Sequence, residues 1–116
     1  MVQMTMSVSD ELAERIKSMG PWLPTVLELS FIGFQTVATA TATEVIRFLS
    51  KEPSPQDVLN YHVSERAQER LRRLLALNEA GMLSEAEQLE LDELQRIEHV
   101  VVMLKAQIAE RSEQGS

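Results

Sequence analysis

The sequence predicts a mainly α-helical protein that begins with one short strand followed by two helices. Three observations predict this fold class: an alternating apolar and polar segment at the N-terminus, several amphipathic segments with helix-capping residues, and a long C-terminal segment with apolar residues every three or four positions. We expect a β-α-α unit at residues 1–35, a linker with short helices at 36–63, an antiparallel helical hairpin at 64–111, and a disordered tail at 112–116.

The N-terminal segment alternates strictly between apolar and polar residues. The apolar set is Val2, Met4, Met6 and Val8, and the polar set is Gln3, Thr5 and Ser7. Period-two alternation puts the two sets on opposite faces of a strand. A single strand leaves its backbone N–H and C=O groups unpaired, and no second convincing strand follows. We therefore expect two copies of the chain to pair their strands in an intermolecular two-stranded ribbon, a homodimer with Met4, Met6 and Val8 at its core.

Two helices are expected after this strand. Ser9 is a good N-cap for the first, acidic residues follow in its first turn, and Gly20 with Pro21 ends it. Pro24 suits the first turn of the second helix. This second helix is apolar on more than one face, so we expect it to be the most buried element of the N-terminal unit.

The linker region carries weaker signals. Residues Thr36–Thr43 alternate threonine with small apolar residues, which favours a loop or a frayed helix end. Thr43 is then expected to cap a short helix over Glu44–Lys51. Pro53 breaks the chain, and residues 54–61 form one more short helical segment.

The C-terminal half has the clearest pattern. Ser64 caps one helix, Gly81 suits the left-handed turn that ends it, and Ser84 with Glu87 forms a capping box for the next. A linker this short predicts an antiparallel hairpin. Its apolar seam, which packs within the hairpin or against a partner, consists of Leu71, Leu74, Leu94, Ile97, Val101, Leu104 and Ile108.

Composition excludes several classes of function. The 116-residue chain has a net charge of −7; residues 1–63 carry 4 basic and 7 acidic side chains, and residues 64–116 carry 7 and 11, so neither half offers a basic footprint for nucleic acid. It contains no cysteine, no signal-peptide pattern and no apolar run long enough to span a bilayer. We expect a cytoplasmic protein without a membrane segment.

Catalysis, metal binding and cofactor binding have no support in the sequence. His62 and His99 are the only histidines, and neither has a second ligand at helical spacing. The four glycines form no phosphate-binding loop, and no serine lies in a nucleophile elbow. We expect a protein that is not an enzyme and has no cofactor.

Two polar groups leave alternatives open. On the ribbon, Gln3, Thr5 and Ser7 either contact DNA bases or remain in solvent while the ribbon only dimerises the chain; no Lys or Arg accompanies them. Farther along, Arg66, Arg70 and Arg73 are spaced by four and three, so they share one helix face. They either meet a phosphate or acidic partner, or form salt bridges within the hairpin.

The segment from Met4 to Arg15 resembles the start of bacterial antitoxin-type ribbon-helix-helix proteins. The order of later segments, at residues 23–29, 44–49, 53–58 and 70–78, resembles a family of small bacterial proteins with a C-terminal hairpin. The resemblance implies a homodimeric antitoxin-like protein that binds and neutralises a partner such as a toxin-like nuclease, with DNA binding as a means of autoregulation. Leu23 and Pro24 stand where DNA-binding relatives have a Ser/Thr cap. The alternative is a structural helical adaptor within a larger assembly.

Overall fold

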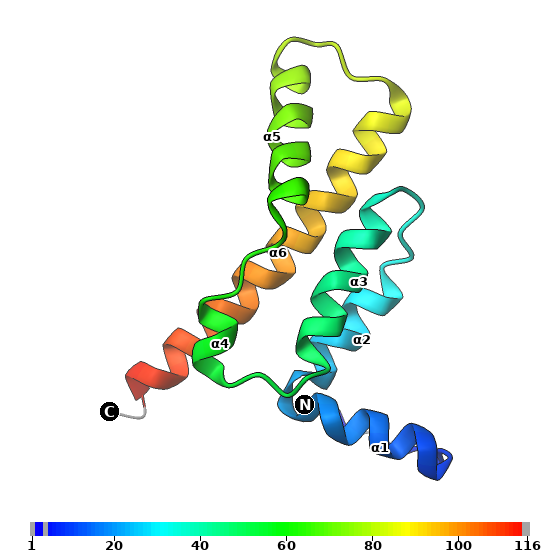
Figure 1. Ribbon diagram of the computed structural model, residues 1–116, viewed down its shortest axis with the longest axis vertical. Coiled ribbons are helices and arrows are strands. Elements are labelled where there is room, and N and C mark those ends of the chain that lie inside the picture. The colour runs from blue at the N-terminus through cyan, green and yellow to red at the C-terminus, as the bar shows by residue number, and fades with distance from the viewer. Residues whose placement is uncertain (1, 4, 115–116) are drawn as a thin grey trace.

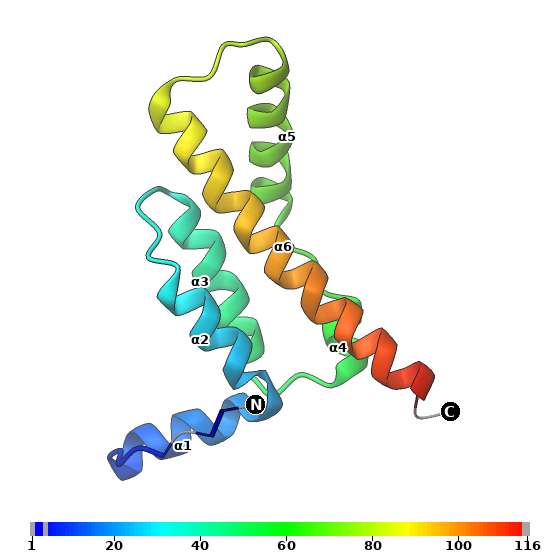
Figure 2. The ribbon, with the colours of Figure 1, turned by 180° about the vertical axis from the view of Figure 1, so that it is seen from behind.

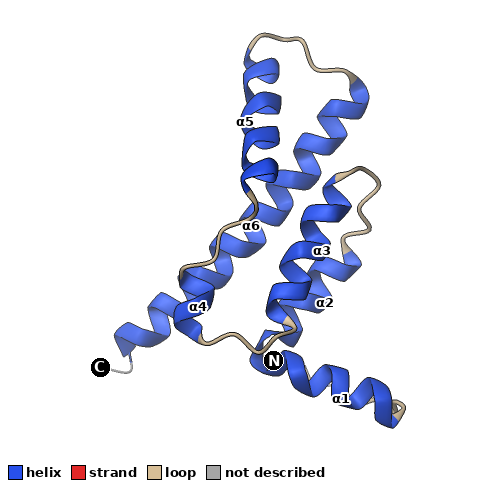
Figure 3. Cartoon of the chain, in the orientation of Figure 1, coloured by secondary structure: helices blue, strands red, loops and turns tan. Residues whose placement is uncertain are grey.

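The computed structural model describes residues 2–3 and 5–114, and this part of the chain is helical with no strand (Figures 1 and 3). The elements are α1 (Asp10–Met19), a short 3₁₀ helix η1 (Gly20–Trp22), α2 (Leu23–Phe31), α3 (Ala38–Leu49), α4 (Pro55–Leu59), α5 (Glu65–Glu79) and α6 (Glu85–Gln114). The long helix α6 is central, because α2, α3, α4 and α5 all pack against it. The mainly α prediction is therefore correct.

The predicted N-terminal strand, and with it the intermolecular ribbon, is wrong. The described residues before Asp10 have no regular secondary structure; Met6 is 71% exposed, Val8 is only partly buried, and Met4 lies outside the described residues. Alternation stabilises a strand only when one face is buried and a neighbouring strand completes its hydrogen bonds. Neither condition is met here, because the segment instead turns back beside α1 (Figure 2).

The chain turns sharply between α1 and α2. Ser9 caps α1 by accepting a hydrogen bond from the Leu12 amide at 3.2 Å, and Gly20 ends the helix at φ +55°. Trp22 is buried in η1, and its indole N–H donates to the Pro53 carbonyl at 2.9 Å. This bond ties the start of α2 to the loop that leaves α3.

Helix α3 begins earlier in the chain than predicted. Residues 36 and 37 form a turn, but residues 38–43 are helical, and the helix does not begin at Glu44 because α3 is continuous from Ala38. Its buried stripe is Ala38, Ala42, Val45 and Leu49, each at most 3% exposed. The spacing of four, three and four places the stripe on one face, and small side chains let a helix approach its neighbours closely. The alternating threonines fill the other faces.

The helical hairpin is formed by α5 and α6. Ser64 caps α5, Ser84 and Glu87 form the capping box at the start of α6, and Gly81 has φ +69° in the connecting turn. Helix α6 is about 45 Å long at 1.5 Å per residue. It extends to Gln114, so residues 112–114 of the expected disordered tail are helical; residues 115 and 116 lie outside the described chain.

Candidate functional site

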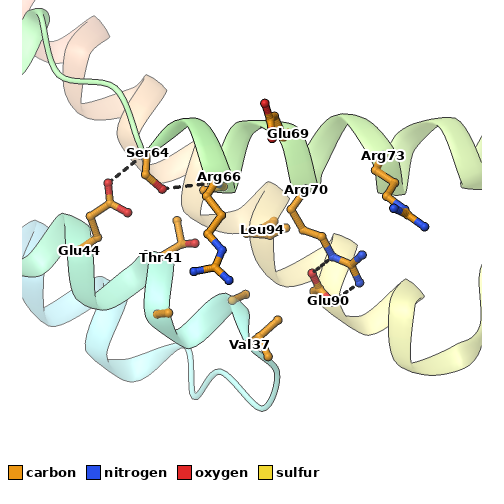
Figure 4. A pocket seen from close by; sticks show the side chains of 13 residues that line it. Val37, Thr41, Glu44, Ser64, Arg66, Glu69, Arg70, Arg73, Glu90 and Leu94 are labelled. Carbon is orange, nitrogen blue, oxygen red and sulfur yellow. Dashed lines mark hydrogen bonds and ion pairs between the residues drawn. The ribbon is translucent and has the colours of Figure 1, made fainter.

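An open cleft of about 670 Å³ lies between α3 and α5, next to α6 (Figure 4). The side chains that α3 contributes are small and mostly apolar, whereas α5 contributes Arg66, Arg70 and Arg73. In Figure 4, Arg66 extends toward α3 and Arg70 extends toward Glu90. We call this the arginine cleft. It is lined by Val37, Ala38, Ala40, Thr41, Glu44, Ser64, Arg66, Ala67, Glu69, Arg70, Arg73, Glu90 and Leu94.

The central arginine is held by a buried acid. Arg70 donates two hydrogen bonds to the Glu90 carboxylate, from Nε at 2.6 Å and from the guanidinium NH2 at 2.9 Å. The Glu90 side chain is 8% exposed and that of Arg70 is 38% exposed. The hydrogen bond to Glu90 raises the pKa of Arg70 above its ordinary value. This bidentate pair links α5 to α6 and neutralises the charge of Arg70.

The two outer arginines are different. Arg66 and Arg73 are exposed, and neither forms an ion pair within the described chain. Glu69 lines the rim but its side chain extends away from the cleft in Figure 4. Because seven residues separate them on one helix, the backbones of Arg66 and Arg73 are about 10 Å apart. The cleft therefore presents two arginines that form no ion pair among the described residues, one on each side of the Arg70–Glu90 pair. Hydrogen bonds from Ser84, with smaller contributions from the charges of Arg70 and Arg73, lower the pKa of the nearby Glu87 carboxyl.

Glu44 shapes the other end of the cleft. Its Oε1 accepts hydrogen bonds from the Ser64 amide at 2.8 Å and from the Tyr61 hydroxyl at 3.4 Å. Burial, together with the nearby Glu44 carboxylate, raises the pKa of Tyr61 to about 12. The Tyr61 ring stacks on Phe48 with centroids 4.2 Å apart. Glu44 thus links α3 to the start of α5 rather than pairing with Arg66.

The residues predicted to bind a partner or DNA lie in two different environments. Gln3, Thr5 and Ser7 are exposed in the irregular N-terminal segment, without the strand that was to present them. The predicted seam residues pack inside this single chain: Leu74, Leu94, Ile97, Leu104 and Ile108 are buried, and Leu71 and Val101 are partly buried. The seam is therefore hairpin core.

Helix α2 carries exposed apolar surface. It is the most buried helix of residues 1–35, as predicted, because Val26 and Leu29 are buried whereas α1 has no buried residue. Leu27, however, is 45% exposed and Phe31 is 82% exposed. Both exposed residues lie on one face, four positions apart. The apolar residues on more than one face of α2 were the signal, because α3 and α6 can cover only one of them.

Within the described residues, no group of three or more His, Cys, Asp or Glu side chains is arranged to hold a metal ion. No helix among them combines the length and apolar character needed to cross a membrane. Searches with this chain found no matching family model, no matching curated protein and no matching solved structure.

Proposed function

We propose that this chain is an antitoxin-like protein-interaction module, which binds and neutralises a partner protein such as a toxin-like nuclease. The observation that carries the proposal is the arginine cleft, where Arg66 and Arg73, which form no ion pair with a described residue, flank the Arg70–Glu90 pair. Buried or interfacial guanidiniums bind carboxylates strongly and with defined geometry. We infer that the cleft receives an acidic segment of the partner.

A nuclease has the two kinds of charge that this chain complements. Its substrate-binding surface is basic because it binds phosphates, whereas nuclease metal sites are built from carboxylates. The chain has a net charge of −7, which favours association with a basic protein. We expect Arg66 and Arg73 to bind the carboxylates of the nuclease metal site. Nucleic acid is a poorer ligand for the cleft, since its lining contains no aromatic side chain on which a base could stack.

The alternative is a structural helical adaptor that joins a larger assembly without neutralising a toxin. The exposed Leu27 and Phe31 on α2 support this alternative, because an apolar helix face of this kind is typical of protein contact surfaces. It predicts stable association with an unrelated complex and no protection of growth. DNA binding through Gln3, Thr5 and Ser7 is not proposed, because the strand that would present them is absent from the described residues.

The test is co-expression with the product of the neighbouring gene. We expect the two proteins to co-purify and growth to be rescued. The Arg66→Ala/Arg73→Ala variant should bind the partner at least about tenfold more weakly, because tenfold corresponds to only about 1.4 kcal/mol of binding free energy and two charged contacts are removed. Arg72→Ala is the matched control, since Arg72 is exposed on the same helix and does not line the cleft.

Two results would count against the proposal. If the neighbouring gene product neither binds nor is neutralised, the antitoxin-like role is wrong. If it binds but the double variant and Arg72→Ala behave alike, the arginine cleft is not the binding site.

A further inference from the structure

A second cavity, of about 460 Å³, lies between α5, α6 and the loop that joins α4 to α5. From α5 it is lined by Gln68, Leu71 and Arg72, on the opposite flank of that helix from the arginines of the arginine cleft. We call it the apolar cavity, because most of its lining is aliphatic: Val63, Leu71, Leu94, Ile97, Val101 and Val102.

The size of the apolar cavity favours a small molecule over a protein segment. Its volume lies within the range of about 300–1,000 Å³ that is typical of small-molecule sites. A helix about 10 Å wide that rises 1.5 Å per residue fills roughly 120 Å³ per residue, so the cavity would admit only about one turn.

A lysine that is not paired with an acid borders this cavity. Lys105 is partly buried and is the last residue of α6 that lines the cavity. Its Nζ donates to the Tyr61 carbonyl at 2.5 Å, and it forms no ion pair with a described residue. The backbone carbonyl positions the ammonium without cancelling its charge. Because an ammonium has three N–H donors, Lys105 retains capacity for a further acceptor.

The other charged side chains of the lining set the sign of the ligand. Glu98 is the single acid among the lining residues; it is exposed, and it lies seven positions before Lys105, about 10 Å along α6. Arg72 is a second cation, and it also forms no ion pair with a described residue. The lining thus has two cations and one acid, although the whole chain has a net charge of −7. An anionic group is therefore favoured beside Lys105.

We propose that the apolar cavity binds an aliphatic monocarboxylate, such as a medium-chain fatty acid. Its carboxylate accepts a hydrogen bond from Lys105 Nζ, and its chain lies along Val101 and Ile97 toward Leu71. Burial of the chain supplies affinity, and the charge-assisted hydrogen bond fixes the orientation. The inference does not rest on the proposed function, because the site uses none of the arginines of the cleft.

The first test compares three probes that share one aliphatic chain: decanoate, decanol and decylammonium. Isothermal titration calorimetry with the full chain is expected to show saturable one-to-one binding of decanoate. Decanol and decylammonium should bind at least tenfold more weakly, because the first cannot form an ion pair with Lys105 and the second brings a like charge to it. Decanoate should shift the backbone amide NMR signals of Val63, Val101 and Val102.

The second test is a matched pair of substitutions, Val102→Glu and Met103→Glu. The two residues are adjacent on α6 and similarly exposed, at 53% and 46%, but only Val102 lines the cavity. We expect Val102→Glu to bind decanoate at least tenfold more weakly, because it adds an acid beside the bound chain, and Met103→Glu to change the affinity by less than twofold. Lys105→Met, which keeps the aliphatic stem, should reduce the affinity for decanoate to that for decanol.

Three results would overturn the inference. The first is the absence of saturable decanoate binding up to the millimolar range. The second is equal binding by Val102→Glu and Met103→Glu, or NMR shifts confined to the arginine cleft. The third is binding of decanol and decylammonium as tight as that of decanoate. If Lys105→Met fails to fold because its bond to Tyr61 is lost, the two exposed substitutions still decide.

Discussion

The Glu93 side chain accepts a hydrogen bond from the Thr36 hydroxyl at 2.6 Å, so an acid on α6 holds the residue that precedes α3. The same carboxylate also accepts from the Gln35 amide at 2.8 Å and the Thr36 amide at 3.0 Å. Glu93 is 5% exposed. Three donors at the start of a helix are thus satisfied by one buried carboxylate, which is where the helix dipole favours a negative charge.

Replacing this carboxylate should destabilise the fold. We expect Glu93→Gln to lower the free energy of unfolding by about 1–3 kcal/mol, because the amide replaces one charged acceptor oxygen with a donor group facing N–H groups. Urea denaturation measures the change. Glu98→Gln is the control, as Glu98 is exposed on the same helix. Equal effects of the two substitutions would contradict this account.

The contribution of Glu93 should depend on pH. Burial acts to raise the pKa of its carboxyl, but the hydrogen bonds from Thr36 and Gln35, with nearby Arg96, outweigh burial and hold the pKa below its ordinary value of 4.5. A carboxyl with a lowered folded-state pKa stabilises the fold above its unfolded-state pKa, and this stabilisation is lost as pH falls through the folded-state pKa. The stability difference between the unaltered chain and Glu93→Gln should therefore shrink as the pH falls below 4.5 and through the lowered pKa of Glu93. A difference independent of pH would argue against a charged Glu93.

The Arg70–Glu90 pair should be sensitive to removal of one partner. Arg70→Ala leaves the Glu90 carboxylate buried without a cation, and we expect a loss of roughly 1–3 kcal/mol, below the range for fully buried pairs because Arg70 is 38% exposed. The double variant Arg70→Met/Glu90→Leu should recover part of this loss, because no buried charge remains. A double-mutant cycle measures the coupling, and additive effects would indicate that the pair contributes nothing.

Two leucines on α2 provide a matched test of burial. Leu29 is 1% exposed, so Leu29→Ala should cost about 2–5 kcal/mol through lost contacts and a cavity. Leu27 is 45% exposed, and Leu27→Ala should change stability by no more than about 0.5 kcal/mol. Both substitutions lie in the same helix, so differences in helix propensity cancel. Similar losses at both sites would mean that the two side chains are equally covered in solution, for instance by a partner.

Substitution of Gly81 tests the backbone conformation of the turn between α5 and α6. It has φ +69°, and a Cβ there would meet no atom within 4 Å, so any cost of Gly81→Ala comes from the backbone alone. We expect a loss of about 1 kcal/mol, since L-residues disfavour the left-handed region. Thermal unfolding compared with Gly81→Asn, which tolerates this region better, checks the interpretation. An alanine variant as stable as the unaltered chain would mean that the turn changes conformation.

Local signals in the sequence were enough to predict the capped ends of most helices. Ser9, Ser54, Ser64 and Ser84 all accept hydrogen bonds from the helices that they precede, because capping requires only a side chain and an amide three residues away. The antiparallel hairpin was predicted from its apolar seam and from Gly81 in the short connecting turn. The shared face of Arg66, Arg70 and Arg73 was also visible, since their spacing alone places them together.

The arginine cleft itself could not be predicted, because its opposite wall is the first half of α3. Residues 36–43 have weak helix propensity, and the turn before α3 is held by Glu93, which is 57 residues from Thr36 in the chain. The sequence also could not show which arginine was already neutralised. Only the packing of α5 on α6 pairs Arg70 with Glu90, whereas Arg66 and Arg73 form no ion pair with a described residue.

The amino-acid order by itself determined where the four serine-capped helices begin and which side chains share a face, because these depend on neighbours within a few residues. The tertiary structure decided whether the alternating N-terminal segment became a strand, which face of α2 was covered, and which charges on α5 found partners. Those outcomes depend on groups that only folding brings together. A strand needs hydrogen bonds from a distant segment, and no described part of the chain supplies them here.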